Sequence, residues 1–399
     1  MPRASTSGLP RSPSADPRPP PHLYPTAGFR FREDPAWFDP AGGGCYLPRA
    51  RDRPDRTVRS GILRVSMRVL HVVADYPTRA RPHAQVFVRN QVDSLVAAGV
   101  ACDVLILRGR SLLKYATGWL QVQSRLRRGA FDLLHAHYAY CGLVSLGHGI
   151  PLVTSLLGSD LVGFARRDGS YPALSRVAHR RLARHVAGRS DACIVKSRAM
   201  RDRLGLPVHV VPNGVDLDRF EPVDAETRVR LRDELGLPQE AILVLFAGNP
   251  RVALKRFPLA EAAVRTAEPR VPRPLHLVPI SGRSQDDVVR HMQACDLLLL
   301  TSSQEGSPNV VKEAMAAGMA VVAVDVGDTR ERLAGVPGCR VTADDRPETI
   351  AAALADVITS EESRGGRAAV EPLRIEKVAA RIMEIYGEAL ARRSPAGRG

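Results

Sequence analysis

Residues 301–318 read TSSQEGSPNVVKEAMAAG and directly follow the apolar run DLLLL. This stretch predicts a buried strand, a short loop and a helix. Ser307 suits an N-cap, Pro308 suits the first helical position, and Gly318 suits the position just past the last turn. A loop that leads from a strand into a helix is a common phosphate site in α/β sheets, because free amides and the helix dipole attract anions.

Two glutamates flank the start of this helix. Glu305 lies in the loop before it, and Glu313 lies about 8 Å along it at a rise of 1.5 Å per residue. We expect the amides of Asn309 and Val310 to face a diphosphate, so that one end of the ligand reaches Glu305 and the other reaches Glu313. A glutamate is usually solvated, but the apolar neighbours of Glu313 argue against simple solvation here.

Outward from this segment, short β-branched runs alternate with amphipathic stretches, which predicts βαβ units and parallel sheets covered on both faces. Expected strands are 68–74, 102–107, 132–136, 151–155, 192–196, 208–211, 242–247, 275–279, 296–301, 320–324 and 339–342. Expected helices are 84–98, 112–128, 173–188, 197–204, 226–236, 256–267, 284–294, 308–317, 347–358 and 371–391.

A run of turn-forming residues, PNGVDLDRFEP, interrupts this pattern at 212–222. A chain of 399 residues exceeds what one core usually serves, so we expect two doubly wound domains, 67–214 and 215–374. Residues 375–399 are expected to hold a helix that returns to the first domain, and a tail. No GxGxxG follows the first strand of either half, which disfavours a dinucleotide-dependent dehydrogenase.

Residues 1–66 lack periodicity and contain the run PRSPSADPRPPPH, so we expect a disordered extension. Met67 directly precedes RVLHVVA and is a second candidate start, in which case 1–66 are not translated. The extension has no apolar core of a signal peptide, and no stretch of 18 apolar residues predicts a membrane span. Six scattered cysteines without a CxxC pair suit core positions and a reducing cytoplasm, which is the expected location.

The net charge of +15 is unevenly distributed. Residues 67–215 carry 21 basic and 8 acidic side chains, whereas 216–399 carry 25 and 28. The stretches 112–128 and 173–189 combine apolar spacing with arginines, which predicts peripheral docking on an anionic membrane face. A helix that covers a sheet shows the same pattern, so both interpretations stay open. Nucleic acid is disfavoured as a partner, because the chain is only 5% aromatic and has no stacking series.

Several motifs in a fixed order carry a resemblance to a known family. Glu305-x7-Glu313 resembles the Glu-x7-Glu motif of family-four retaining glycosyltransferases (glycosyl transferases group 1). VVPNGVDLDRF at 210–220, LFAGNPRVALKRFPLAEAAV at 245–264 and FDLLHAHYAY at 131–140 are also similar to that family. The resemblance implies a GT-B fold, in which two Rossmann-like domains face each other across a cleft.

The resemblance also implies roles on the donor side. Glu305 would hold the donor sugar, and Glu313 the donor ribose. Gly306, Ser307, Asn309 and Val310 would surround the phosphates. Arg251 and Lys255 would bind the diphosphate and stabilise the charge that builds on the leaving oxygen. Two cations and a helix N-terminus can replace a divalent ion, and no DxD cluster stands at the end of an expected strand, so we expect no metal and no cofactor.

On the acceptor side, His137 is the candidate that the resemblance implies for contact with the acceptor or reaction centre. Two departures from the family stand out. Family members often carry glycine in the loop after the first strand, where this chain has His83-Ala84-Gln85-Val86-Phe87, and a histidine where it has Leu157. Ser159, Asp160 and Gln85 are the polar candidates on the acceptor side. His135 and His137 could be mistaken for a metal pair, but the sequence shows no further ligand beside them.

We therefore expect a metal-independent, retaining hexosyltransferase that uses a UDP or GDP sugar. Its acceptor would be a glycan or lipid-linked molecule of cell-envelope or exopolysaccharide synthesis. A sugar-nucleotide epimerase or hydrolase of the same fold would use the same cleft without needing a basic acceptor domain. A degenerate sugar-nucleotide-binding protein is a third hypothesis, which the intact Glu305, Arg251, Lys255 and Glu313 disfavour.

Overall fold

The computed structural model describes residues 45–46, 67–78, 81–109, 113–163, 165–360, 362 and 366–393. Within the extension 1–66, the described element is β1 (Cys45–Tyr46), which pairs antiparallel with β3 (Ala101–Ile106) at a sheet edge. This pairing departs from the expectation of a wholly disordered extension. The other residues of 1–66 lie outside the described part of the chain.

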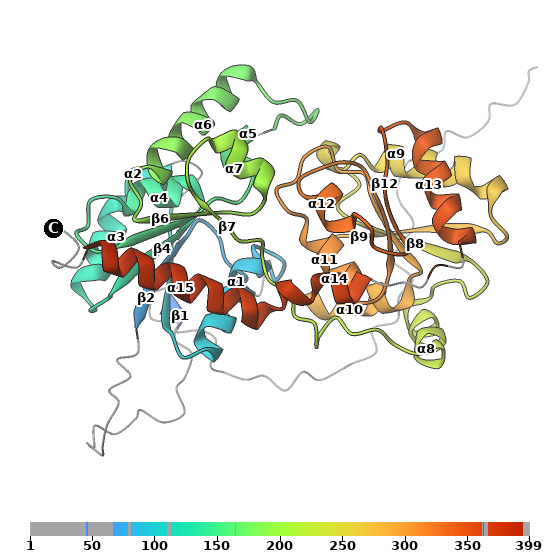
Figure 1. The fold of residues 1–399 in the computed structure, drawn as a ribbon, viewed down its shortest axis with the longest axis horizontal. Coiled ribbons are helices and arrows are strands. Elements are labelled where there is room, and N and C mark those ends of the chain that lie inside the picture. The colour runs from blue at the N-terminus through green and yellow to red at the C-terminus, as the bar shows by residue number, and fades with distance from the viewer. Residues whose placement is uncertain are drawn as a thin grey trace, which may run out of the picture. The chain divides into compact units, whose positions relative to one another are not determined.

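The first sheet has seven strands in the order β1-β3-β2-β4-β5-β6-β7, and every neighbouring pair except β1 and β3 is parallel (Figure 1). The remaining strands are β2 (Arg68–Val73), β4 (Leu133–His137), β5 (Leu152–Ser155), β6 (Ala192–Val195) and β7 (His209–Val210). From β2 the chain visits β3 on one side and then β4 on the other. The strand order therefore reverses between β2 and β4.

Helices cover both faces of the first sheet, as the parallel pairing requires. Along β2, Val69 and Val73 belong to the core beneath α1 and α15, whereas Leu70 and Val72 belong to the core beneath α3 and α4. The helices of this half are α1 (Val86–Ala97), α2 (Leu113–Ala116), α3 (Gly118–Arg127), α4 (Ala139–Ser145), α5 (Ser159–Val162), α6 (Ala173–Ala187) and α7 (Arg198–Leu204).

The second sheet has five parallel strands in the order β12-β11-β10-β8-β9, so its order reverses between β8 and β10. They are β8 (Ile242–Ala247), β9 (Leu275–Ile280), β10 (Leu297–Leu300), β11 (Ala320–Ala323) and β12 (Cys339–Val341). One apolar core, which includes Leu243, Leu298 and Val321, joins this sheet to its helices.

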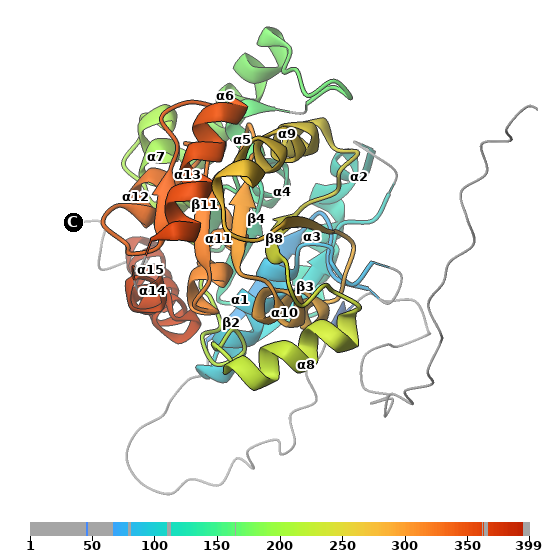
Figure 2. The same cartoon turned by 90° about the vertical axis from the view of Figure 1, so that its right-hand side faces the viewer.

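The helices around the second sheet pack in pairs. Figure 2 shows α8 beside α10 and α9 beside α13, and both pairs are in contact. The α-helices are α8 (Ala225–Leu235), α9 (Phe257–Ala267), α10 (Gln285–Ala294), α11 (Asn309–Ala316), α12 (Thr329–Leu333), α13 (Pro347–Thr359), α14 (Gly366–Val370) and α15 (Ile375–Arg393). Three 3-10 turns are η2 (Ala253–Lys255), η3 (Glu268–Arg270) and η4 (Glu371–Leu373).

The structure confirms the predicted fold class, and every predicted strand is present within one residue at either end. The expected helix 112–128 is wrong in one respect, because it is split into α2 and α3. Gly118 opens α3 where a Cβ would lie 2.9 Å from Cγ1 of Val144, so the chain needs a glycine at this close approach. The short helices α4, α5, α12 and α14 were not anticipated, since four to seven residues show too little periodicity.

The predicted positions of the cysteines are also confirmed where the structure describes them. Cys102, Cys141, Cys193, Cys295 and Cys339 are buried free thiols. None of the described helices is both long and apolar enough to cross a bilayer.

The last helix, α15, packs on the first sheet although it follows the second in sequence (Figure 1). Its buried residues Val378, Ile382, Ile385 and Tyr386 share a core with β2 and α1. The Tyr386 hydroxyl forms a 2.6 Å hydrogen bond with Nδ1 of His135 on β4. This hydrogen bond joins two residues that are 251 positions apart in the sequence.

The chain crosses between the two sheets twice, and the two crossings are paired. The amide of Val215 donates to the carbonyl of Leu373, and the amide of Ile375 donates to the carbonyl of Val215. A Cβ on Gly214 would lie 2.8 Å from Cα of Ile375, so glycine permits this close approach. The predicted domain boundaries near 214 and 374 fall at these crossings and stay a prediction.

Replacing Tyr386 with phenylalanine should lower the free energy of unfolding by about 1–3 kcal/mol, because Nδ1 of buried His135 would lose its partner. Urea denaturation measures this change. Tyr115→Phe is the matched control, since this half-buried ring stacks on Tyr140 and the substitution preserves the stack. Equal stability of the two variants would show that the Tyr386 bond contributes nothing.

Candidate functional site

The two reversals of strand order mark where a ligand should lie. In open parallel sheets, ligands bind outside the carboxyl ends of the strands where the order reverses. The second sheet reverses between β8 and β10, and the loops that follow them hold Arg251, Lys255 and Glu305. The first sheet reverses between β2 and β4, and the segments that follow hold Gln85 and Tyr138.

The most direct contact between predicted site residues is an ion pair. Nζ of Lys255 lies 2.6 Å from Oε1 of Glu305, and the two side chains are 31% and 20% exposed. The loops that carry them are joined by backbone bonds, since the amide of Ser303 donates to the carbonyl of Leu254. The hydroxyl of Thr301 also donates to the carbonyl of Lys255 at 2.8 Å. The structure thus brings one predicted cation and the predicted sugar ligand together.

The residue after Lys255 fixes this loop. Arg256 has a left-handed backbone (φ 52°) and forms the N-cap of α9. Its guanidinium donates to the carbonyl of Thr301 at 2.5 Å and pairs with Asp345. A left-handed backbone at a residue other than glycine costs about 1–2 kcal/mol, so the surrounding contacts must hold it in place.

Helix α11 begins one residue later than the sequence predicts. Pro308, with φ −66° and ψ 115°, is the N-cap, and Asn309 is the first helical residue. Ser307 does not cap, because its hydroxyl donates to Oδ2 of Asp328 at 2.9 Å. The helix ends before Gly318, which is left-handed as predicted (φ 70°).

The start of α11 retains the features of an anion site. The amides of Asn309 and Val310 have no hydrogen-bond acceptor among the described residues. Gly306, just before it, is closely surrounded: a Cβ there would lie 3.2 Å from both the carbonyl of Leu157 and Sδ of Met200. The loop therefore passes close to the first half of the chain at a residue without a side chain.

A buried lysine that the sequence argument missed lies in the same helix. Lys312 is 1% exposed, and its Nζ donates to the carbonyl of Asn213 at 3.0 Å and to Oγ of Ser307 at 3.2 Å. Burial lowers its pKa to about 8, although the carboxylates of Asp328 and Glu313 oppose the shift. The burial of Lys312 could have been predicted from the sequence, because this lysine stands in an expected helix between the runs NVV and AMAA.

A second missed lysine lies at the end of β6. Lys196 is 3% exposed, and no acceptor for its ammonium is found in the described part of the chain. Burial lowers its pKa to about 7, and the charge of Lys312 adds to this effect. A buried cation is costly unless an anion balances it. At neutral pH Lys196 is therefore partly neutral, and Lys312 is the larger of the two positive charges near the start of α11.

Glu313 is half-buried in α11, as the apolar setting predicts. Burial raises the pKa of its carboxyl to about 7, against the nearby charges of Lys312 and Arg219. Near neutral pH the carboxyl can therefore both donate and accept, which suits contact with sugar hydroxyls.

Several buried polar atoms near these sheet ends lack described partners, among them one of Asn213 and one of Gln85. Oδ1 of Asn213 is buried and unpaired, while Nδ2 of the same amide donates to Oδ1 of Asn309 at 3.2 Å. Oε1 of Gln85 is also buried without a described partner. Gln85 is left-handed (φ 45°) and is the N-cap of α1, a backbone geometry that favours glycine.

His137 lies in a buried cluster with His71 and His135. Nε2 of His137 is 3.1 Å from Nδ1 of His71, and His135 contacts Oγ of Ser155 at 2.9 Å as well as Tyr386. Burial lowers the pKa of all three rings, that of His71 to about 3, so they are neutral.

The sequence alone showed no third metal ligand beside His135 and His137, and the structure corrects that interpretation. His71 supplies one, and a nitrogen of each ring lies within 4.8 Å of the others, which is close enough to share a metal ion. Both nitrogens of His135 already have protein partners, whereas Nε2 of His71 is buried without a partner among the described residues. The absence of a metal stays a prediction.

Asp160 and Ser159 differ in what they can contact. Both oxygens of buried Asp160 accept backbone amides, from Ala139 at 2.6 Å and from Leu157 at 2.5 Å. Burial raises its pKa to about 6 despite these bonds. Asp160 therefore positions the start of α4 and the Leu157 loop, whereas Ser159 is exposed and lines a cavity.

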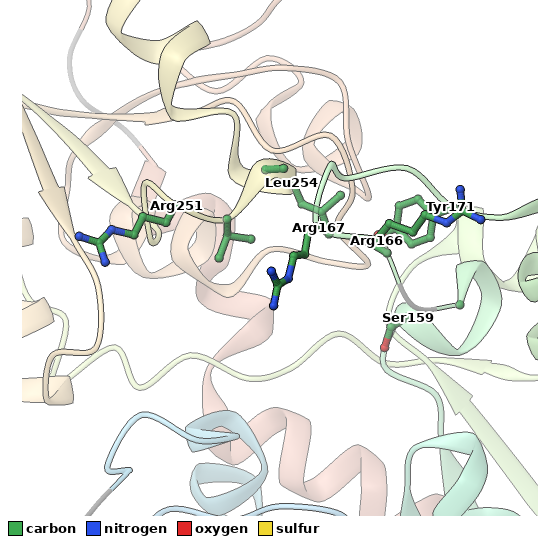
Figure 3. Close-up of a pocket in the computed structure, with 10 residues that line it drawn as sticks. Ser159, Arg166, Arg167, Tyr171, Arg251 and Leu254 are labelled. Atoms are coloured by element: carbon green, nitrogen blue, oxygen red, sulfur yellow. The ribbon is translucent and has the colours of Figure 1, made fainter. Parts of the chain in front are cut away.

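This cavity has a volume of about 630 Å³ and lies between two loops (Figure 3). Arg251, Val252, Ala253 and Leu254 line it on one side. On the other side it is lined by Ser159, Gly163, Ala165, Arg166, Arg167 and Tyr171. The predicted residues Arg251 and Ser159 thus border one space, next to the Lys255–Glu305 pair.

Comparison with known families matches residues 70–219 to Glycosyltransferase Family 4 and residues 239–360 to Glycosyl transferases group 1. Over 333 residues the chain is 30% identical to the D-inositol 3-phosphate glycosyltransferase of Xylanimonas cellulosilytica. The matched segment covers 71% of this chain and 78% of that relative.

Solved structures agree on the fold. Sucrose-phosphate synthase of Thermosynechococcus elongatus matches with a TM-score of 0.64 and 16% identity, covering 82% of this chain and 99% of that one. Anabaena Alr3699/HepE in complex with UDP-glucose matches with a TM-score of 0.61 and 17% identity, covering 80% and 99%.

Proposed function

This chain belongs to the group 1 glycosyltransferases, and from that premise we propose that it transfers a hexose-type sugar from a UDP or GDP sugar. We propose that the transfer retains the anomeric configuration and that the acceptor is a glycan or a lipid-linked molecule. Cell-envelope or exopolysaccharide synthesis is the proposed setting. The observation that carries the proposal is the Lys255–Glu305 pair beside the free amides of Asn309 and Val310. UDP-glucose in the HepE complex supports a nucleotide sugar as donor.

The chemistry requires stabilisation of a leaving diphosphate. When the bond between sugar and phosphate breaks, negative charge grows on the phosphate oxygen, and fixed positive groups lower the barrier. Lys255, Arg251 and the start of α11 supply such groups. Lys312 and Lys196 add charge that the sequence argument did not foresee. In the absence of donor, Glu305 balances Lys255, and the donor's phosphates would take over part of that role.

Glu305 would then accept hydrogen bonds from the donor sugar, and Glu313 would contact the ribose. Glu305 precedes α11 and Glu313 lies about 6 Å past its start at 1.5 Å per residue, which suits a ligand whose diphosphate lies at the helix start. Retention of the anomeric configuration rests on the resemblance to the family. His137 is buried and contacts His71. Its proposed role at the acceptor therefore requires that one edge of its imidazole ring be accessible to the acceptor.

Glu305→Gln should lower kcat about 10²–10³-fold, the loss typical when one group that stabilises a transition state is removed. Initial rates of sugar transfer measure it, and circular dichroism checks the fold. Glu240→Gln is the control, because Glu240 is an exposed residue away from these loops. Wild-type turnover in Glu305→Gln would remove this residue from the site.

Transfer should continue in excess chelator, because the proposed charge stabilisation comes from Lys255, Arg251 and helix amides. The measurement compares initial rates before and after dialysis against EDTA. Loss of activity that magnesium or manganese restores would refute the metal-independent mechanism. Restoration by zinc alone would direct attention to the cluster of His71, His135 and His137.

We also propose that the basic first half docks on an anionic membrane face. On α6, Ala183 and Val186 pack inward, whereas Leu174 is 81% and Val177 39% exposed. Arg180 and Arg181 are exposed on the same helix. Exposed apolar and basic side chains on one helix suit the interface of an anionic leaflet.

Arg180→Gln combined with Arg181→Gln should weaken vesicle binding about thirty-fold, at roughly 1 kcal/mol for each basic side chain. Co-sedimentation with phosphatidylglycerol vesicles measures it. Arg184 is left unchanged, because its guanidinium donates to the carbonyl of Leu204. Arg265→Gln with Arg270→Gln removes the same charge from the second half and is the control. If vesicle binding does not depend on the charge of the lipid, the basic first half has no specific affinity for an anionic membrane.

A further inference from the structure

Lys196 is the buried charge to which the proposed function assigns no contact. It directly follows β6, is 3% exposed, and has no acceptor for its ammonium among the described residues. Lys312, the other buried lysine, has two acceptors, the carbonyl of Asn213 and Oγ of Ser307. A buried ammonium that has lost its water needs an anion or hydrogen-bond acceptors in its place. The protein supplies them to Lys312 but not to Lys196.

The position of β6 places Lys196 on one face of the first sheet. Ile194 belongs to the core beneath α1 and α15, and side chains alternate along a strand, so Lys196 continues this face. His135 and His137 on β4 share the face, because Tyr386 of α15 bonds His135. Burial lowers the pKa of both histidines, and the charge of Lys196 contributes, which agrees with this placement.

The same lysine is close to the start of α11. The chain after β7 runs beside it, because the amide of Val211 donates to the carbonyl of Val195. Lys312 of α11 bonds the carbonyl of Asn213, two residues further along this run. Burial lowers the pKa of Lys196, and the charge of Lys312 adds to this effect, so the two lysines are near each other. Lys196 therefore lies near the free amides at the start of α11.

No protein anion pairs with Lys196 in the described part of the chain. The ionisable groups that act on it most are Lys312 and Cys193, and neither is a carboxylate. The neighbouring strand β5 holds no ionisable group. The acids on α7 and α15, which pack against β6, are all exposed: Asp202, Glu376, Glu384 and Glu388. The other ionisable groups of these helices and of β7 are Arg198, Arg201, Arg203, His209, Lys377, Arg381, Tyr386, Arg392 and Arg393. An anion beside Lys196 would therefore come from a ligand.

Two oxygens at the same edge of the sheet also lack partners. Oδ1 of Asn213 and Oε1 of Gln85 are buried without a partner among the described residues. Gln85 precedes α1, which covers the face that carries Lys196. Buried polar groups are nearly always paired, so several unpaired groups at one edge mark a place that a polar ligand completes. A sugar diphosphate carries what these groups lack, namely anionic oxygens for an ammonium and hydroxyls for amide oxygens.

We infer that Lys196 is a donor-binding residue of the first half of the chain, that its ammonium pairs with a phosphate of the nucleotide sugar, and that donor binding charges it. The inference rests on the proposed function and adds a binding residue outside the loops of the second half. An ammonium and a phosphate oxygen form a charge-assisted hydrogen bond, which is stronger than a neutral one. When the sugar leaves, the same ammonium would stabilise the charge that remains on the diphosphate.

Donor binding should then be coupled to proton uptake. Burial lowers the pKa of Lys196 to about 7, so at pH 8 this amine is neutral in about nine-tenths of the free protein. A phosphate beside the amine favours the ammonium and raises its pKa. Binding at pH 8 should therefore take up about one proton, whereas at pH 6 Lys196 is already charged. Affinity for the diphosphate should fall as the pH rises above 7, by up to about tenfold per pH unit.

Isothermal titration calorimetry of the full chain with UDP and with GDP tests this, in two buffers of different ionisation enthalpy at pH 6 and at pH 8. Burial brings the pKa of Glu313 to about 7 and that of Lys312 to about 8, so the variant Lys196→Met is needed to assign the proton. We expect this variant to bind the diphosphate about tenfold or more weakly and to take up about one proton fewer at pH 8. Methionine preserves the apolar stem of the side chain, and thermal unfolding checks the fold.

Lys377→Met is the matched control, because it removes one exposed lysine from α15. Uridine and guanosine, which lack phosphate, should bind Lys196→Met as tightly as the wild type. Equal affinity and equal proton uptake in Lys196→Met and Lys377→Met would overturn the inference, and so would a wild-type chain that takes up no proton at pH 8. If neither UDP nor GDP binds the wild-type chain, the proposed donor fails as well.

Discussion

Parallel strand pairing is the constraint on which the rest of this structure depends. Because all strands of a parallel sheet point the same way, their carboxyl ends meet at one edge, and a reversal of strand order opens a crevice there. The second sheet reverses between β8 and β10, and Lys255 and Glu305 follow those two strands. Their 2.6 Å contact is therefore a consequence of topology, since the two residues are 50 positions apart.

Backbone strain is concentrated at these same edges. Among the described residues, the non-glycine residues with positive φ are Gln85, Tyr138 and Arg256. Each is the N-cap of a helix that follows β2, β4 or β8. Such conformations cost free energy and persist where surrounding contacts enforce them, which is typical of ligand sites.

A concentration of basic side chains is the second feature of these sheet edges. Lys196 and Lys312 are buried near the start of α11, and three arginines line the adjacent cavity without acidic partners. Positive charge of this kind suits the diphosphate of the proposed donor.

The sequence by itself determined the order of strands and helices, the loop with Glu305, and Gly318 after α11, because periodicity and turn chemistry are local. It misplaced the cap of α11, since Ser307 is engaged by Asp328, 21 positions away. Lys312 on Asn213, His71 on His137 and Tyr386 on His135 join residues 99, 66 and 251 positions apart. Only the tertiary structure could decide these contacts and the cavity around Arg167, because burial and the pairing of charges depend on which distant segments the fold brings together.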